Sequence, residues 1–166
     1  MILKTQISKK EYVKLLYGLT YKKPMILFLL CVAGAILLWV IGYYTHLLPV
    51  PKPTVYQYLT LVIITVIQPF TIYKTILKNY NTSSHLKESL EIECTPECIK
   101  VRGESFCTEF TWAKMYKVVE LKNWFVVYQN NLSANLIPKK SFLPHQADEF
   151  KQMLTSIPEL RCKLKK

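Results

Sequence analysis

The stretch MILFLLCVAGAILLWVIGYY, residues 25–44, contains no charged residue and no strongly polar one. As a helix with a rise of about 1.5 Å per residue it would span about 30 Å, the thickness of the hydrocarbon core of a bilayer. Trp39, Tyr43 and Tyr44 lie near its end, as interfacial aromatic residues do. An apolar run of this length covers the whole circumference of a helix, so the pattern favours a membrane span over the buried helix of a soluble protein.

A second and more polar run, VYQYLTLVIITVIQPFTIY at residues 55–73, is predicted to be the second span. Pro69 is expected to kink it. Because a glutamine in lipid needs a partner on a neighbouring helix, we expect Gln68, with Thr65 and Thr71 nearby, to face the first helix or a second copy of the chain. No ionisable group lies at membrane depth, which favours helix packing over an ion or substrate path.

The charges orient this predicted hairpin. The 166 residues carry a formal net charge of +11, yet residues 24–73 hold a single charged side chain, Lys52, in a short proline-rich loop. Basic residues gather before the first span and after the second, and four of them are candidates for the membrane surface: Lys22, Lys23, Lys74 and Lys78. The positive-inside rule then places both termini in the cytoplasm and the loop at residues 45–54 outside.

The first 23 residues are predicted to be a basic arm. Residues 2–7 alternate weakly, as a strand does, and whether that strand joins the sheet of the C-terminal region is left open. Ser8 and Glu11 have the spacing of a helix capping box, and apolar residues follow at helical spacing. The resulting basic amphipathic helix is expected to lie either at the membrane surface or against the cytoplasmic domain.

From residue 79 onward the hydrophobic period changes to two. Six short strands separated by turn residues are predicted, within residues 90–94, 99–102, 106–110, 118–121, 124–128 and 132–137. A helix is predicted over residues 144–157, and Pro158 ends it. The fold class is therefore a membrane α-helical hairpin plus a cytoplasmic α+β domain, in which an antiparallel β meander is closed by a C-terminal helix.

Four residues of this domain are candidates for contacts with partners. Lys139 and Lys140 follow the last predicted strand, where they are expected to be exposed and to face the membrane surface. Trp124 and Phe125 lie beside a predicted turn at residues 122–123, and large aromatic residues are common in protein interfaces. We therefore expect these two to contact a protein partner.

Three stretches of the domain resemble the YcxB-like family of small bacterial membrane proteins. They are residues 104–112, a polar strand ending in an aromatic residue; residues 112–118, WAKMYKV; and residues 137–142, IPKKSF, which lead into the last helix. The order of arm, two adjacent spans and C-terminal domain is also similar to that family, although this chain is richer in cysteine and its second span is more polar. The resemblance implies a bacterial inner membrane protein, a pleckstrin-homology-like fold for residues 79–166, and no catalytic residues to carry over.

The side chains that usually carry chemistry form no recognisable motif. The five cysteines do not have the spacing of a zinc site, and Cys94 is predicted to point inward while Cys107 points outward. The three histidines are scattered, and four glycines are too few for a phosphate-binding loop. We therefore expect no enzyme activity, no catalytic residue, no cofactor and no metal. Nucleic acid is not expected either, because the basic excess follows the predicted membrane topology.

These features predict a non-catalytic, membrane-anchored interaction module that presents a small β domain at the inner leaflet to a protein partner or an anionic lipid. Two alternatives come from other classes of protein. The chain could be an immunity protein that binds and neutralises a membrane- or envelope-targeting bacterial toxin, or a small subunit of a membrane transport or signalling complex. The expected partners are the lipid bilayer, a protein such as a toxin or a membrane complex, and a second copy of the chain.

Overall fold

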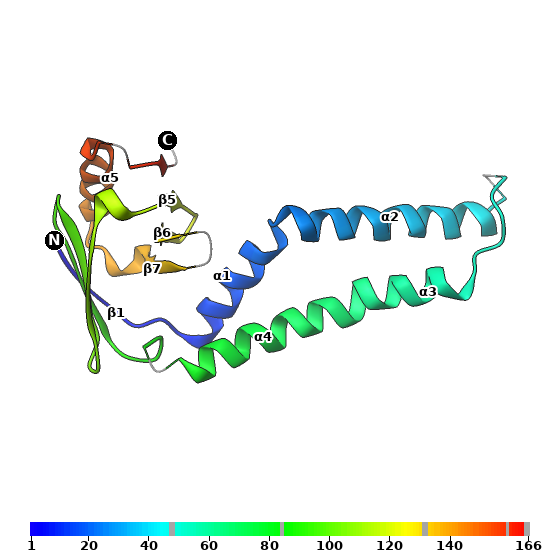
Figure 1. Ribbon diagram of the computed structural model, residues 1–166, viewed down its shortest axis with the longest axis horizontal. Coiled ribbons are helices and arrows are strands. Elements are labelled where there is room, and N and C mark those ends of the chain that lie inside the picture. Colours follow the sequence, from blue (N-terminus) through cyan, green and yellow to red (C-terminus); the bar gives the residue numbers. More distant parts are fainter. Residues whose placement is uncertain (47–48, 84, 131–132, 159, 165–166) are drawn as a thin grey trace. The chain divides into compact units, whose positions relative to one another are not determined.

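The computed structural model describes residues 1–46, 49–83, 85–130, 133–158 and 160–164. The chain forms two compact units, one helical and one rich in β-strands. The β unit consists of Met1–Ile7 together with Ser84–Lys166, and the helical unit consists of Ser8–Ser83. The helical unit is therefore inserted into the β unit, between its first strand and all the others (Figure 1).

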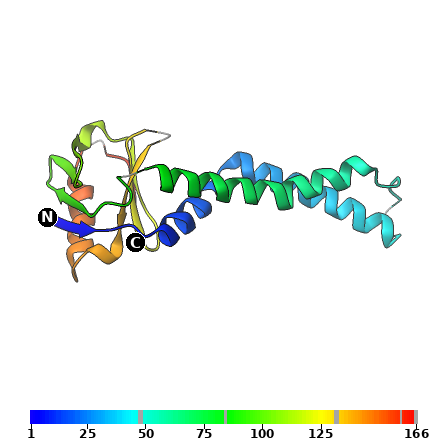
Figure 2. The same cartoon turned by 90° about the horizontal axis from the view of Figure 1, so that it is seen from below.

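The helical unit begins with α1 (Lys9–Tyr21) and α2 (Pro24–Tyr44). The chain then returns through one long helix made of α3 (Val55–Val62), a π-helical turn η1 (Ile63–Ile67) and α4 (Gln68–Thr82). Figures 1 and 2 show α2 lying alongside the long helix, which it contacts through α3 and η1. α1 packs on α4, where the rings of Tyr12 and Tyr80 have centroids 5.4 Å apart.

Both long helices are apolar enough to cross a membrane. α2 has 21 residues and a mean hydropathy of 2.8, and the helix Val55–Thr82 has 28 residues and a mean hydropathy of 1.6. Only 11% of either apolar window is buried, so side chains such as Phe28 and Leu38, both 67% exposed, lie on the surface. The two helices predicted from the sequence are confirmed, and the second continues past the predicted end at residue 73.

The irregularity expected at Pro69 takes the form of the π-helical turn. The N–H of Gln68 donates to the carbonyl of Ile63, five residues earlier instead of four. A proline lacks an N–H, and its ring crowds the carbonyl four residues before it, which here belongs to Thr65. Widening the preceding turn by one residue relieves that crowding without ending the helix.

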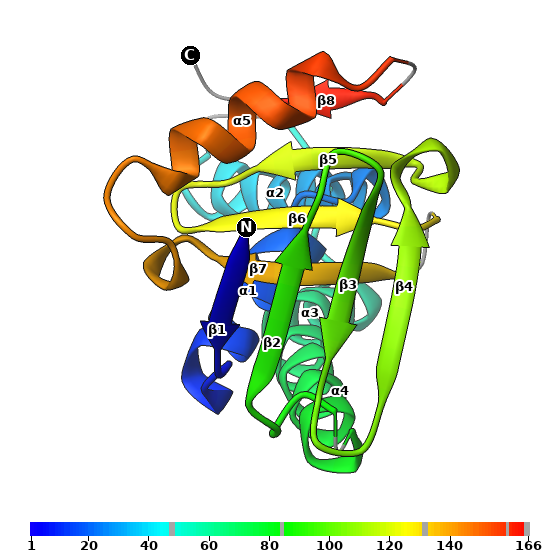
Figure 3. The same cartoon turned by 90° about the vertical axis from the view of Figure 1, so that its left-hand side faces the viewer.

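The β unit contains two four-stranded sheets, whose strands cross one another in Figure 3. The first sheet has the order β1-β2-β3-β4 and is antiparallel throughout. The second has the order β7-β6-β5-β8, in which only the pair of β5 with β8 is parallel. The strands are β1 (Ile2–Thr5), β2 (Leu90–Cys94), β3 (Cys98–Arg102), β4 (Cys107–Thr111), β5 (Lys117–Glu120), β6 (Trp124–Tyr128), β7 (Ala134–Pro138) and β8 (Cys162–Lys163).

The antiparallel strands of the prediction are confirmed, but they do not form one continuous meander. A 3₁₀ turn, η2 (Trp112–Lys114), separates β4 from β5. Trp112 fixes this corner because its side chain is 1% exposed and its indole N–H donates to the carbonyl of Thr95 at 2.8 Å. The chain thus leaves one sheet and starts the other. The predicted start of the last antiparallel strand at residue 132 lies outside the described residues.

The N-terminal strand joins the first sheet. Leu3 of β1 pairs with Ile92 of β2, and both side chains are 1% exposed. The terminal amine of Met1 donates to the carbonyl of Cys94 at 2.9 Å, so pairing begins at the first residue. This answers the question that the sequence left open, and it divides the predicted basic arm at residues 1–23 between the two units.

The core of the β unit lies between the sheets and the C-terminal helix. α5 (Gln146–Ser156) covers it with Phe150 and Leu154, which are fully buried. The Phe150 ring packs edge-on against Phe125 with centroids 5.1 Å apart, and it lies 6.3 Å from the ring of Trp112. The predicted terminal helix that closes the core is therefore confirmed.

Candidate functional site

The lysines predicted to flank the spans are all exposed, two in the link between α1 and α2 and two within α4. Lys22 and Lys23 occupy the short link between α1 and α2. Lys74 and Lys78 are four residues apart on α4 and therefore lie on one face of that helix. The ammonium group of Lys74 lies 4.6 Å from the centroid of the Phe70 ring, so the charge sits beside an apolar surface. This arrangement is typical of a lysine at a membrane interface.

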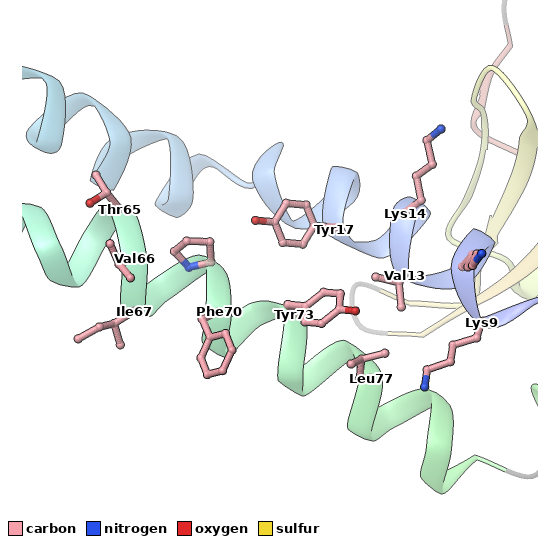
Figure 4. Close-up of a pocket in the computed structure, with 12 residues that line it drawn as sticks. Lys9, Val13, Lys14, Tyr17, Thr65, Val66, Ile67, Phe70, Tyr73 and Leu77 are labelled. Carbon is pink, nitrogen blue, oxygen red and sulfur yellow. The ribbon is translucent and has the colours of Figure 1, made fainter.

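An open groove runs between α1 and α4, both within the helical unit. Its volume is about 1010 Å³. Figure 4 shows Lys9 and Lys14 of α1 at one end and Thr65, Val66 and Ile67 at the other. The lining side chains come from two segments: Lys9, Lys10, Val13, Lys14 and Tyr17 from α1, and Thr65, Val66, Ile67, Pro69, Phe70, Tyr73 and Leu77 from the long helix. The groove is therefore cationic at one end and apolar at the other.

The sequence indicated the amphipathic helix α1 but not this groove. Its capping box is confirmed, since the Ser8 N–H donates to the Glu11 carboxylate at 3.2 Å and the Glu11 N–H donates to the Ser8 hydroxyl at 3.4 Å. The sequence offered two docking places for α1, the membrane surface and the cytoplasmic domain. The structure packs Tyr12 and Leu15, both buried, within the helical unit, where α1 contacts α4. The two expected docking places stay predictions.

The polar residues predicted to lie in the second span differ in how their side chains are satisfied. The hydroxyl of Thr65 donates to the carbonyl of Leu61 at 2.6 Å, and that of Thr71 donates to Ile67 at 2.8 Å. Both threonines are exposed, and their hydroxyls are satisfied within their own helix. Neither hydroxyl therefore needs a partner on the first helix, and the expected contact with the first helix or a second copy of the chain stays a prediction. The amide group of Gln68 is enclosed, and among the described residues it has no hydrogen-bond partner.

Lys139 is only partly exposed, at 24% of its side chain, which corrects the expectation of a fully exposed lysine. Its expected place at the membrane surface stays a prediction. Its ammonium group forms an ion pair with the carboxylate of Glu120, a side chain that is only 2% exposed. Lys151 approaches the same carboxylate at 3.6 Å. The Lys139 ammonium group also lies 5.1 Å from the centroid of the Phe125 ring. A nearly buried carboxylate requires such cations, because water does not solvate it. Lys140 is exposed, as expected.

Trp124 and Phe125 are not available to a partner, which corrects a second expectation. Trp124 is 8% exposed and Phe125 is fully buried. The Phe125 ring packs against Phe142, with centroids 5.5 Å apart, as well as against Phe150. Their place next to the turn at residues 122–123 suggested exposure, but β6 is buried from Trp124 to Val127, and Phe125 belongs to the core of the β unit.

The cysteines and histidines do not converge on a reactive site. Cys94 is 2% exposed and Cys107 is exposed, on opposite faces of the first sheet, as the alternation predicted. Burial raises the pKa of the Cys94 thiol to about 12, which suppresses the nucleophilic thiolate. Cys98 and Cys107 lie at opposite ends of the β3–β4 pair. In the part of the chain that the structure describes, no three His, Cys, Asp or Glu side chains gather as a metal site would require.

The outer face of the first sheet carries a ladder of alternating charges. Lys4 pairs with Glu91 at 3.8 Å, and Lys100 pairs with Glu109 at 3.3 Å. The Glu109 carboxylate raises the pKa of Lys100 by accepting its hydrogen bond. The ladder holds equal numbers of each sign: Lys4, Lys100 and Arg102 against Glu91, Glu93 and Glu109. This face therefore has no net charge with which to attract an anionic surface.

The comparison with known families falls on the strands and helix just described. Residues 94–154 match the family of YcxB-like proteins. This confirms the resemblance on which the sequence analysis relied, over β3 to β7 and most of α5. No curated protein and no solved structure matched the chain. The YcxB-like segment lies wholly in the β unit, so the helical unit and its groove are features of this chain beyond the matched segment.

Proposed function

We propose that this YcxB-like chain is a non-catalytic, membrane-anchored interaction module that holds its β unit at the cytoplasmic face of a bacterial inner membrane and presents it to a protein partner. One observation carries the proposal: the apolar hairpin is inserted between β1 and β2, two strands that pair with each other. The β unit is therefore attached to the hairpin by two chain connections instead of one. If the hairpin lies in the bilayer, both connections hold the β unit at its surface.

The helices have the dimensions that this anchoring needs. At about 1.5 Å per residue, α2 measures about 31 Å and the helix Val55–Thr82 about 42 Å, against a hydrocarbon core of about 30 Å. The longer helix thus extends beyond the hydrocarbon into the interface, where Lys74 and Lys78 belong. In water, the exposed apolar side chains of both helices would be an aggregation hazard. In a bilayer the same apolar side chains would contact lipid hydrocarbon, which is favourable for them.

The pairing of β1 with β2 also constrains on which side of a membrane the two ends of the hairpin lie. Because β1 precedes the hairpin and β2 follows it, a membrane-spanning hairpin must return the chain to the side from which it left. The basic residues of the helical unit support the cytoplasm as that side. Residues 8–83 contain eight lysines and one acidic residue, and only Lys52 lies in the loop between the spans. We place both termini in the cytoplasm on this basis.

The β unit has features of a binding domain rather than of an enzyme. Two crossed sheets closed by a terminal helix are consistent with the pleckstrin-homology-like fold that the family resemblance implies. The described residues offer no cluster of three ligands for a metal, and burial raises the pKa of the Cys94 thiol. The charge-balanced outer face of the first sheet suits a protein with complementary charges better than a uniformly anionic membrane.

Cysteine labelling in intact cells tests the anchoring and the orientation. The variant Thr54→Cys in a Cys107→Ser background should react with a membrane-impermeant maleimide before lysis. The unmodified chain, whose Cys107 is exposed, should react only after lysis. Labelling of Cys107 in intact cells would reverse the proposed orientation. Extraction of the chain from membranes by alkaline carbonate would show that it does not span the bilayer.

Photo-crosslinking in cells tests the binding role. A photoreactive amino acid at Lys100, on the outer face of the first sheet, should give one discrete adduct with another protein. The same amino acid at Lys52, in the loop on the other side of the membrane, should not give that adduct. If Lys100 and two further outer-face positions, Lys4 and Glu109, give no protein adduct, the β unit is not the binding domain that we propose.

A further inference from the structure

The groove between α1 and α4 has no role in the anchoring argument above, and its two ends differ in chemistry. We propose that it holds one anionic phospholipid of the cytoplasmic leaflet, with the phosphate at the lysine end and an acyl chain along α4. This inference rests on the proposed function, because it needs the hairpin in the bilayer with α4 emerging on the cytoplasmic side. It goes further by assigning a specific lipid site to the helical unit.

Charge complementarity favours an anionic headgroup. Lys9, Lys10 and Lys14 are exposed side chains of α1 that line one end of the groove. None of the described residues that line it is acidic. Glu11, the single acidic residue of the helical unit, is turned to the Ser8 cap, where its carboxylate accepts from the Ser8 N–H. Three lysines in the lining, with no acidic residue among the described lining residues, give this end of the groove a positive charge that suits a phosphate.

The rest of the lining suits an acyl chain. Val66, Ile67 and Phe70 are 60%, 51% and 58% exposed, although they belong to the apolar half of the long helix. No charged side chain lines this end of the groove. Hydrocarbon covering these side chains buries apolar surface without leaving a polar group unpaired, because the Thr65 hydroxyl already donates to Leu61.

The apolar part of the groove fits within one leaflet. From Val66 to Tyr73, the residue before the interface lysine Lys74, the long helix rises by about 10 Å, which fits within the roughly 15 Å of one hydrocarbon leaflet. The volume of about 1010 Å³ is at the upper end of the range for small-molecule sites, roughly 300–1,000 Å³. Figure 4 shows Lys9 and Lys14 at the end of the groove toward Leu77, and Lys78 follows Leu77 on α4, so the phosphate would sit at the interface.

The test counts lipids bound to the full chain in detergent by native mass spectrometry during a titration with phosphatidylglycerol. The groove variant Lys9→Gln/Lys10→Gln/Lys14→Gln should bind on the order of 100-fold more weakly than the unmodified chain, since each lysine near an anionic lipid contributes roughly a fivefold gain. The control Lys22→Gln/Lys23→Gln/Lys74→Gln removes the same charge from lysines that do not line the groove. It should retain one tightly bound lipid.

A second pair of variants tests the apolar end without changing the charge. Val66→Trp fills the groove and should displace the lipid. Ile63→Trp adds the same bulk to an exposed neighbour that does not line the groove, and it should leave binding unchanged. Circular dichroism establishes that each variant keeps its helices.

Several outcomes would overturn the assignment. Equal loss in the groove variant and its charge-matched control would mean general attraction to anionic lipid. Equal binding of phosphatidylcholine would mean that the lysines do not select charge. A dimer that Val66→Trp abolishes would mean that a second copy of the chain occupies the groove. If the chain gives the expected labelling but binds no lipid, only the lipid site is refuted. If the labelling itself differs from expectation, the proposed function is refuted.

Discussion

Glu120 forms an ion pair with Lys139, a lysine that the sequence analysis predicted to face the membrane surface. Its carboxylate is almost fully enclosed, and Lys139 and Lys151 lie against it from β7's end and from α5. Nothing in the local sequence around Lys139 indicates this partner, which is nineteen positions away. Because Glu120 is buried, its carboxylate would be costly to leave unpaired. Lys139 therefore has a structural role, although the sequence around it resembles that of an ordinary surface lysine.

We expect Lys139→Ala to lower the free energy of unfolding by about 2–3 kcal/mol. Removing one partner of a buried pair costs roughly 3–5 kcal/mol, and here Lys151 and the partial exposure of Lys139 reduce the loss. Denaturant unfolding of the full chain in detergent, followed by tryptophan fluorescence, measures it. Lys122→Ala, in an exposed turn, is the control. If both variants unfold alike, the Glu120 pair does not stabilise the β unit.

Cys94 gives the β unit a stability that depends on pH. Its thiol has a pKa of about 12 in the folded chain and 9.0 in the unfolded one, because burial disfavours the thiolate. The stabilising effect of the neutral thiol is complete below pH 9. It is lost as the pH rises from about 9 toward about 12, because only the unfolded chain then releases the proton. Unfolding measured across this range should show a smaller decline for Cys94→Ala than for the unmodified chain. An identical decline would contradict the assignment.

Among the helices and strands, the first turn of α1 is stabilised by a capping box that can be recognised in the sequence. The Ser8–Glu11 box satisfies N–H groups that a helix otherwise leaves unpaired at its start. The π-helical turn before Pro69 is also local in cause, although the sequence indicated only a kink. The proline removes one hydrogen bond, and the wider turn before it lets the helix continue.

Ser8→Ala should destabilise the first turn of α1 by about 1 kcal/mol, since the hydroxyl that caps the turn is lost. Hydrogen exchange at the amides of residues 9–12 should become about fivefold faster. Lys10→Ala, in the same turn but outside the box, should not accelerate exchange there. Equal rates in Ser8→Ala and the unmodified chain would show that tertiary packing alone holds the turn.

At the scale of the whole molecule, the β unit is discontinuous in sequence. β1 supplies an edge strand from the N-terminus, and Leu3 fills a fully covered place in the core. The Gln6 side chain donates to the carbonyl of Lys87 at 3.2 Å, so the two ends of the insertion lie close together in the β unit. A short flexible linker can therefore replace the whole helical unit.

We predict that residues 1–7 joined through a short glycine–serine linker to residues 84–166 give a soluble, folded β unit. Residues 84–166 alone should aggregate or unfold more readily, because β2 then has a bare edge and the core lacks Leu3. Size-exclusion chromatography and thermal unfolding compare the two. Leu3→Ala in the linked form should cost roughly 2–5 kcal/mol. A fragment 84–166 as stable as the linked form would mean that β1 is dispensable.

The sequence by itself determined the elements whose cause is local. Unbroken apolar runs fix the two long helices, alternation fixes the strands, and apolar residues at helical spacing, with Phe150 and Leu154 among them, fix the terminal helix. These patterns depend on a few neighbouring residues, so they can be recognised without knowing the tertiary structure. They also located the exposed lysines that flank the two apolar runs.

Only the tertiary structure decided which distant segments meet. It paired β1 with β2 across the whole helical insertion, split the strands into two sheets at Trp112, and set β8 parallel to β5. It also buried Phe125, paired Lys139 with Glu120, and formed the groove between α1 and α4. Each of these depends on contacts between residues far apart in the chain. The free energy of such contacts comes from burying two surfaces against each other. The sequence of one segment therefore does not show which other segment it will contact.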